Sequence, residues 1–151
     1  MMTESIRREL RIPQSREKVW QALTDSTFTQ QYFFNSRVES TWRPGASYRL
    51  YNSIGDMTVE GEVLDVDPPH RLVTTFSPLW RADEGGNRYS KVTWEIEQVG
   101  AVCKLTLTQE EFDPDCTLMQ HMNAGWARLL SSLKTLLETG APLPEFKPQS
   151  K

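Results

Sequence analysis

The chain has 151 residues, of which 38% are apolar and 25% are charged, which is the composition of an ordinary soluble globular protein with one sizeable core. Its formal net charge of −3, and the lack of a basic stripe interleaved with aromatic residues, argue against nucleic acid as a partner. No apolar run is long enough to cross a bilayer and no signal-peptide segment opens the sequence, so we expect a cytoplasmic protein without a membrane span.

The first elements predicted along the chain are one strand and two short helices. Residues 5–12 alternate between apolar and polar side chains, which indicates a strand, and Pro13 ends it because proline has no amide hydrogen for the ladder. Ser15 is placed to cap the first helix. A second helix, over residues 27–33, brings a group of aromatic side chains together: Phe28, Tyr32, Phe33 and Phe34.

From residue 36 on, the apolar residues recur with a period of two, which predicts an antiparallel meander with one apolar and one wet face. Turn sequences rich in glycine, proline and aspartate separate its strands. The strands are predicted near residues 36–42, 48–52, 57–66, 72–76, 92–96 and 103–107.

A long one-sided helix is predicted over residues 115–140. Its apolar residues form one broad stripe at helical spacing: Met119, Met122, Trp126, Leu129, Leu130, Leu133, Leu136 and Leu137. Polar residues are expected away from the stripe: Arg128, Ser131, Ser132 and Thr135. Because so wide a stripe needs an apolar partner, the strands must curl around the helix. We expect one domain over residues 1–140 and a proline-rich, flexible tail over 141–151.

Four stretches carry a resemblance to a known superfamily. They are residues 19–24 (VWQALT), 61–72 (GEVLDVDPPHRL), 92–97 (VTWEIE) and the segment from Gly125-Trp126 to residue 140. The sequence resembles the START/Bet v1-like (SRPBCC) superfamily, in the branch named for the C-terminal domain of the activator of Hsp90 ATPase. The resemblance implies an α+β helix-grip fold, in which a curved seven-stranded antiparallel sheet grips a long C-terminal helix and two short helices follow the first strand.

Members of this superfamily commonly hold an apolar cavity between helix and sheet. The resemblance therefore implies a hydrophobic small molecule (a lipid, polyketide or aromatic metabolite) as the partner, although the same apolar residues would also suit a filled core. The candidate ligand-binding residues are large side chains expected to face the interior: Phe33, Phe34, Trp42, Met57, Phe76, Trp80, Trp94, Met119, Met122 and Trp126. Polar side chains that would orient a ligand there are Asn52, Thr74, Gln109 and Asn123.

Catalysis is the alternative to simple binding. Glu111 continues the alternation of the last strand onto its concave face, where a raised pKa would let it act as a general acid or base, but a strand end is also commonly wet. A cyclase-like or hydrolytic enzyme would use Glu111 or a cavity tyrosine such as Tyr51 or Tyr89.

No metal or other cofactor is expected. His70 lies in a turn and His121 lies off the apolar stripe, and neither has neighbours at metal-ligand spacing. The two cysteines, Cys103 and Cys116, are expected to be reduced. A stress-related module that interacts with Hsp90 is our third hypothesis. It ranks last because the co-chaperones that name this branch carry an additional N-terminal domain, for which the sequence shows no counterpart. The sequence leaves the formation of a homodimer open.

Overall fold

The structure is a computed structural model that describes residues 5–33, 35–78, 90–110 and 118–140, with side chains described for all of these except 77–78 and 118–124. Its elements follow one another as β1 (Ile6–Ile12), α1 (Arg16–Thr24), α2 (Ser26–Tyr32), β2 (Arg37–Ser40), β3 (Ser47–Tyr51), β4 (Met57–Asp67), β5 (Arg71–Pro78), β6 (Ser90–Val99), β7 (Val102–Glu110) and α3 (Leu118–Thr139).

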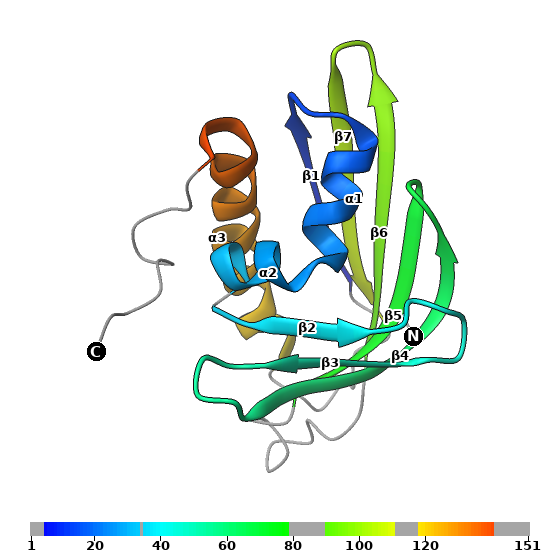
Figure 1. Cartoon of the computed structure of the whole chain (residues 1–151), viewed down its shortest axis with the longest axis vertical. Coiled ribbons are helices and arrows are strands. Elements are labelled where there is room, and N and C mark those ends of the chain that lie inside the picture. Colours follow the sequence, from blue (N-terminus) through cyan, green and yellow to red (C-terminus); the bar gives the residue numbers. More distant parts are fainter. Residues whose placement is uncertain (1–4, 34, 79–89, 111–117, 141–151) are drawn as a thin grey trace.

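The seven strands form one antiparallel sheet in the order β1-β7-β6-β5-β4-β3-β2 (Figure 1). β2 to β7 follow one another as a meander, whereas β1 crosses to pair with β7, so that Ile6 lies opposite Gln109 and Ile12 opposite Cys103. The three helices lie on one side of the curved sheet, with α3 beside the helical pair α1 and α2 (Figure 1). The predicted helix-grip fold is confirmed.

A single residue divides α1 from α2. The backbone N–H of Asp25 bonds to the Gln21 carbonyl oxygen at 2.9 Å and ends α1, while its side chain accepts a hydrogen bond from the Thr27 N–H at 2.8 Å and begins α2. The resulting sharp bend directs Thr29 and Tyr32 of α2 into the interior, where both are buried.

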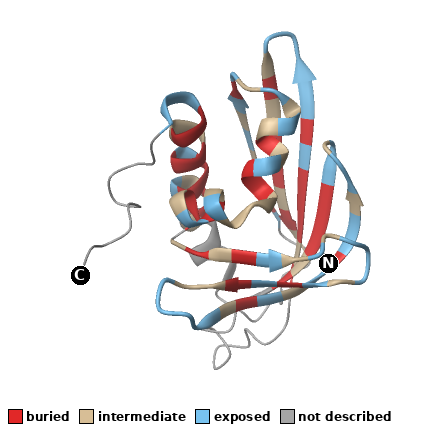
Figure 2. Ribbon diagram, viewed as in Figure 1, coloured by how far each residue is buried: buried red, intermediate tan, exposed pale blue. Residues whose placement is uncertain are grey.

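The core lies between the helices and the concave face of the sheet (Figure 2). Buried residues alternate with more exposed ones along β3, whereas β5, β6 and β7 each have three consecutive buried residues. Trp126, Leu129 and Leu133 of α3 are fully buried, as the apolar stripe predicts. Ser132 was expected off the stripe but has 0% of its surface exposed. Because α3 packs against both β1 and α2, its buried arc is wider than its apolar stripe.

Strands β4 and β5 come very close at Gly61. A Cβ atom placed there would overlap the carbonyl oxygen of Thr75, and the ladder between the two strands shifts register nearby, between Val63 and Asp65. Glycine is therefore required at position 61 by space rather than by an unusual φ. None of the helices that the structure describes is both long and apolar enough to cross a membrane.

Candidate functional site

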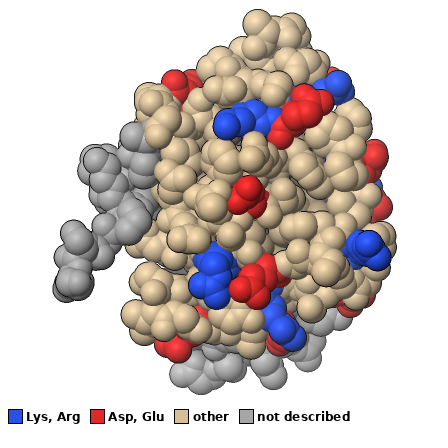
Figure 3. Space-filling view, in the orientation of Figure 1, with Lys and Arg blue, Asp and Glu red and all other residues tan. Residues whose placement is uncertain are grey.

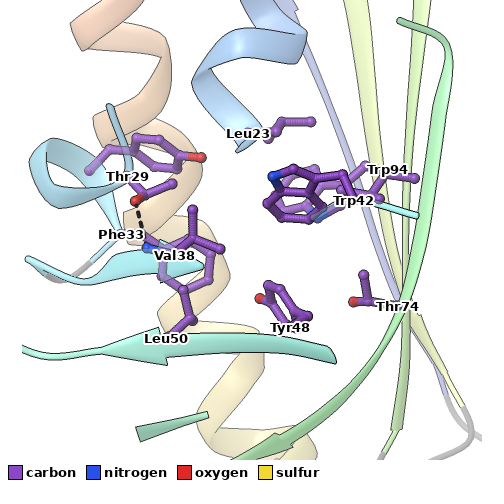
Figure 4. Close-up of a pocket in the computed structure, with 11 residues that line it drawn as sticks. Leu23, Thr29, Phe33, Val38, Trp42, Tyr48, Leu50, Thr74 and Trp94 are labelled. Atoms are coloured by element: carbon purple, nitrogen blue, oxygen red, sulfur yellow. Dashed lines mark hydrogen bonds between the residues drawn. The ribbon is translucent and has the colours of Figure 1, made fainter. Parts of the chain in front are cut away.

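The site is a small cavity between the helical pair and the concave face of the sheet. Its volume is about 10 Å³, close to the least space that one water molecule needs. Eleven side chains line it (Figure 4): Leu23, Thr29, Tyr32, Phe33, Val38, Trp42, Tyr48, Leu50, Leu72, Thr74 and Trp94. In this conformation the described part of the interior is therefore nearly filled.

A cluster of four aromatic rings lies behind one wall of the cavity. Trp126 of α3 is at its centre, with ring centroids 5.9 Å from Phe33, 5.9 Å from Phe76 and 5.8 Å from Trp94. The contacts with Phe33 and Trp94 are edge-to-face, at interplanar angles of 79° and 86°. Phe33 and Trp94 also line the cavity, so the cluster connects the cavity wall to α3.

A chain of buried hydrogen bonds runs beside this cluster. Trp126 donates its indole N–H to Gln109 Oε1 at 2.6 Å, and Gln109 Nε2 donates to Ser90 Oγ at 2.7 Å. Ser90 Oγ in turn lies 3.4 Å from the carbonyl oxygen of Phe76. Gln109 is 0% exposed and faces the concave side, as predicted, but its amide group is already engaged by protein partners.

The cavity contains two tyrosines with different surroundings. The Tyr32 hydroxyl donates to the Ala22 carbonyl oxygen at 2.7 Å, whereas no partner for the Tyr48 hydroxyl is seen among the residues that the structure describes. Burial raises the pKa of both phenols well above the ordinary value of 10.0, so both side chains are neutral donors at physiological pH.

Trp42 forms the part of the wall contributed by the loop between β2 and β3. Its backbone adopts a left-handed conformation with φ 57°, which is uncommon for a bulky residue, and its N–H bonds to Ser40 Oγ at 3.0 Å. The indole ring packs on Tyr48 with centroids 6.0 Å apart.

The predicted ligand-binding residues separate into four groups. Phe33, Trp42 and Trp94 line the cavity, while Phe76 and Trp126 are buried behind it. Others lie outside the described residues or side chains: Phe34, Trp80, Met119 and Met122.

Met57 forms the fourth group, because it is 36% exposed rather than interior. The β3–β4 ladder shifts register between Leu50 and Tyr51, so that Leu50 pairs with Val59 but Tyr51 pairs with Met57. The shift places Met57 opposite Tyr51, whose ring contacts the Arg37 guanidinium at 5.1 Å rather than the cavity. The expectation that Tyr51 is a cavity tyrosine is therefore wrong, and Tyr48 takes that position.

The polar side chains predicted to orient a ligand also lie in different parts of the molecule. Thr74 lines the cavity and is 3% exposed. Asn52 instead lies in the β3–β4 turn, where its Oδ1 accepts hydrogen bonds from the backbone N–H groups of Ile54 and Asp56 at 3.1 and 2.9 Å. The side chains of Asn123 and His121, together with the candidates Glu111, Tyr89 and Cys116, lie outside the part of the structure that is described.

Several cavity residues were not singled out from sequence: Leu23, Thr29, Tyr32, Val38, Tyr48, Leu50 and Leu72. Tyr48 and Leu50 had a readable signal, since their alternation in β3 places both on the face opposite Arg49. No signal in the sequence indicated that Thr29 and Tyr32 line the cavity, because their positions depend on the bend at Asp25.

Charged groups lie on the outside of the molecule. On the face shown in Figure 3, Lys and Arg side chains lie next to Asp and Glu side chains rather than gathering by sign. In the described ranges, no three His, Cys, Asp or Glu side chains are grouped closely enough to hold a metal ion. His70 is exposed in the turn before β5, and Cys103 is buried, which raises the pKa of its thiol.

Comparison with solved structures shows relatives that share this fold. Protein MLL2253 from Mesorhizobium loti is 24% identical, over 89% of this chain and 97% of that one, with a TM-score of 0.77. The Aha1 dimer from Colwellia psychrerythraea is 22% identical over 91% of this chain and 98% of that one, with a TM-score of 0.73. DynU16, described as a putative protein in the dynemicin biosynthetic locus, is 27% identical with a TM-score of 0.76; the match covers 91% of this chain but 48% of DynU16.

Comparison with curated proteins gave no match. A profile of one protein family, described as "Activator of Hsp90 ATPase homolog 1-like protein", matches residues 13–138, which is most of the chain and includes every residue that lines the cavity. The chain therefore belongs to the family of activator of Hsp90 ATPase homolog 1-like proteins.

Proposed function

We propose that this protein binds an uncharged, mainly apolar small molecule (a lipid, polyketide or aromatic metabolite) between the helical pair and the concave face of the sheet. The observation that supports this most directly is the chemistry of the wall, since none of the eleven lining side chains carries a charge. A charged ligand would lose its hydration there without gaining a counter-ion, whereas an apolar ligand would contact aromatic and aliphatic groups on every side.

The similarity to DynU16 adds support of a different kind. That protein is described as a putative protein in the dynemicin biosynthetic locus, and it is 27% identical to this chain over 91% of the chain's length. A role beside small-molecule metabolism fits the uncharged wall of the cavity.

The site must enlarge before it can hold such a ligand. Pockets for drug-sized ligands have volumes of roughly 300–1,000 Å³, and the cavity here has about 10 Å³. Binding therefore requires side chains of the wall to move outward, so affinity depends on how readily the wall opens.

Thermal unfolding and native mass spectrometry test this function directly. Protein purified from its own cells should retain a small molecule in native mass spectra, and a matching compound at one hundred times its Kd should stabilise the fold by about 2.7 kcal/mol. That stabilisation raises the Tm of a chain of this size by about 5–10 °C. The proposal would be overturned if native mass spectra showed only the ligand-free protein and the Tm stayed unchanged with lipids, polyketides and polycyclic aromatic compounds.

A second candidate function is the stimulation of Hsp90, for which the family description is the specific support. It is tested by adding the purified chain to Hsp90 and measuring ATP hydrolysis and association at micromolar concentrations. For the enzymatic alternative, the cavity tyrosine whose hydroxyl has no partner among the described residues would be Tyr48, because Tyr51 lies outside the cavity and Glu111 and Tyr89 lie beyond the described ranges.

A further inference from the structure

The eleven side chains that line the cavity differ in one respect. Ten of them are buried, and Trp42 alone is partly exposed. Figure 4 shows the indole of Trp42 between Leu23 of α1 and Tyr48 of β3. The Trp42 side chain is therefore the part of the wall that separates the cavity from solvent.

Two features of the Trp42 backbone favour movement of the ring: its left-handed conformation and its place in a loop between β2 and β3. A left-handed φ of 57° is strained for a residue other than glycine, and such strain persists only where surrounding contacts enforce it. The loop at Trp42 is outside the ladders of β2 and β3, so the ring can withdraw without breaking a strand pair. When the ring withdraws, relief of the backbone strain would offset part of the contact energy that Trp42 loses on leaving Tyr48.

Four hydroxyl groups belong to the cavity wall, and they divide into two pairs. The Tyr32 hydroxyl donates to a carbonyl oxygen of α1, and Thr29 Oγ1 lies 3.3 Å from both the Ser26 carbonyl oxygen and the Val38 N–H. For Tyr48 and Thr74, by contrast, the described part of the chain supplies no hydrogen-bond partner.

The unpaired hydroxyls lie on neighbouring parts of the wall. Figure 4 shows the Thr74 hydroxyl directed from β5 toward Tyr48, whose own hydroxyl points to the side of its ring away from Thr74. Thr74 and Tyr48 are largely buried, at 3% and 8% exposure, but neither hydroxyl oxygen is among the described polar atoms that are fully enclosed without a partner, so each retains contact with open space. A ligand oxygen that reaches either hydroxyl would gain a hydrogen bond there without first breaking one.

We propose that Trp42 is the gate of this cavity, and that the ligand is a flat, uncharged aromatic molecule that takes the place of the indole and hydrogen-bonds through one oxygen to Tyr48 or Thr74. The inference rests on the proposed binding function and adds the entrance, the anchor and the ligand class. An indole-sized space is enough for such a ligand, since apolar protein cavities on the order of 150 Å³ bind benzene.

Two probes of the same shape test the gate and the anchor separately: 2-naphthol, which carries one hydroxyl, and naphthalene, which carries none. Affinities are measured by titration calorimetry and by ligand-observed NMR. Trp42→Ala should bind both probes at least about tenfold more tightly than the wild type, because the binding-competent state no longer has to displace a ring. Trp42→Phe, which keeps more of the packing, should give a smaller gain in the same direction.

The anchor has its own readout. Either Tyr48→Phe or Thr74→Val should weaken 2-naphthol by up to about tenfold, the effect of one lost hydrogen bond of ~1.4 kcal/mol, and leave naphthalene unchanged. Tyr32→Phe is the matched control, because its hydroxyl is already bonded to Ala22, and it should not alter the ratio of the two affinities.

Trp20→Ala is the matched control for the gate, since Trp20 is a second partly buried tryptophan that packs on the core without lining the cavity. Equal affinities in the wild type, Trp42→Ala and Trp42→Phe, or an equal gain in Trp20→Ala, would overturn the gate. An unchanged 2-naphthol to naphthalene ratio in Tyr48→Phe and Thr74→Val would overturn the anchor. If neither the wild type nor Trp42→Ala binds any apolar compound, the proposed function itself fails.

Discussion

The indole N–H of Trp126 in α3 donates to Gln109 Oε1 in β7 at 2.6 Å, inside a core where both side chains are almost wholly inaccessible. Hydrophobic contacts alone would let a helix slide or rotate on a sheet with little change in energy, whereas this bond requires one alignment. Gln109 continues the connection to Ser90 in β6, so α3 is tied to two central strands at one point.

The first prediction concerns this connection. Gln109→Leu keeps the approximate volume but leaves the Trp126 N–H buried without an acceptor, so the free energy of unfolding should fall by about 2 kcal/mol. The value is measured by urea titration followed by circular dichroism. Gln98→Leu is the control, because Gln98 is exposed and all its side-chain bonds lie within its own hairpin: Nε2 donates to the Gly100 and Val102 carbonyl oxygens and Oε1 accepts from Cys103 Sγ. It should cost less than about 1 kcal/mol. Equal losses in the two variants would show that the buried bond has no special role.

The second prediction concerns the close approach of β4 and β5. Gly61→Ala places a methyl group against the Thr75 carbonyl oxygen, and backbone cannot move aside as a flexible side chain can. We expect a loss of about 3 kcal/mol or more in the free energy of unfolding, at the upper end for overpacking.

Gly100→Ala gives the comparison for that variant. Position 100 has open space around it but a φ of +63°, so alanine there should cost only on the order of 1 kcal/mol through backbone strain. In thermal unfolding, Gly61→Ala should therefore have a clearly lower Tm than Gly100→Ala. The reverse order of the two Tm values would contradict the close approach of β4 and β5.

The third prediction concerns alkaline pH. Burial raises the pKa of Tyr32 and Tyr48 in the folded protein above 10.0, their ordinary value, so the unfolded chain loses these protons first. The stability that the neutral phenols support is complete below pH 10 and declines as the pH rises from 10 toward the raised values, by up to about 1.4 kcal/mol per pH unit for each tyrosine.

Urea unfolding between pH 8 and 11.5 measures that slope. Tyr48→Phe should flatten it, and the double variant Tyr32→Phe, Tyr48→Phe should flatten it further. A Tyr48→Phe protein with the full wild-type slope would contradict the buried position of Tyr48.

The fourth prediction concerns the junction between α1 and α2. Asp25→Ala removes the acceptor of the Thr27 N–H and hydroxyl, at 2.8 and 2.6 Å, and should cost about 1 kcal/mol. The hydroxyl and N–H of Thr27 hold the pKa of Asp25 below its ordinary 3.8, so the contribution of the carboxylate is present above that pH and is lost as the pH falls through the lowered pKa.

Asp25→Asn separates the two effects, because an amide oxygen still caps the helix but does not titrate. Its unfolding free energy at pH 7 should stay close to that of the wild type, with less loss between pH 5 and pH 2. Asp56→Ala, in an exposed turn, is the control and should change stability by less than about 0.5 kcal/mol.

Much of the fold was predictable because local chemistry determines its boundaries. Ser15 caps α1 as the sequence indicates, and the left-handed Gly140, with φ 84°, follows the end of α3. The strict alternation in β6 and β7 predicts the buried face that includes Trp94 and Leu107.

The site was less predictable because it depends on departures from regular periods. The register shift beside Leu50 pairs Met57 with Tyr51, which alternation in β3 already directs away from the cavity, so Met57 lies outside although simple alternation in β4 places it inside. Trp42 lines the cavity only because its backbone leaves the extended region after β2. Such local shifts are decided by the packing of the whole sheet, which no window of sequence contains.

The pairing of β1 with β7 has a consequence for how the chain folds. Ile6 finds its partner Gln109 only after the intervening meander has been synthesised and brought into place, so the contact order of this sheet is high. During translation β1 has to remain unpaired while β2 to β6 leave the ribosome. We therefore expect slow folding, in which the closing step joins the earliest strand to the latest one and α3 then covers the completed concave face.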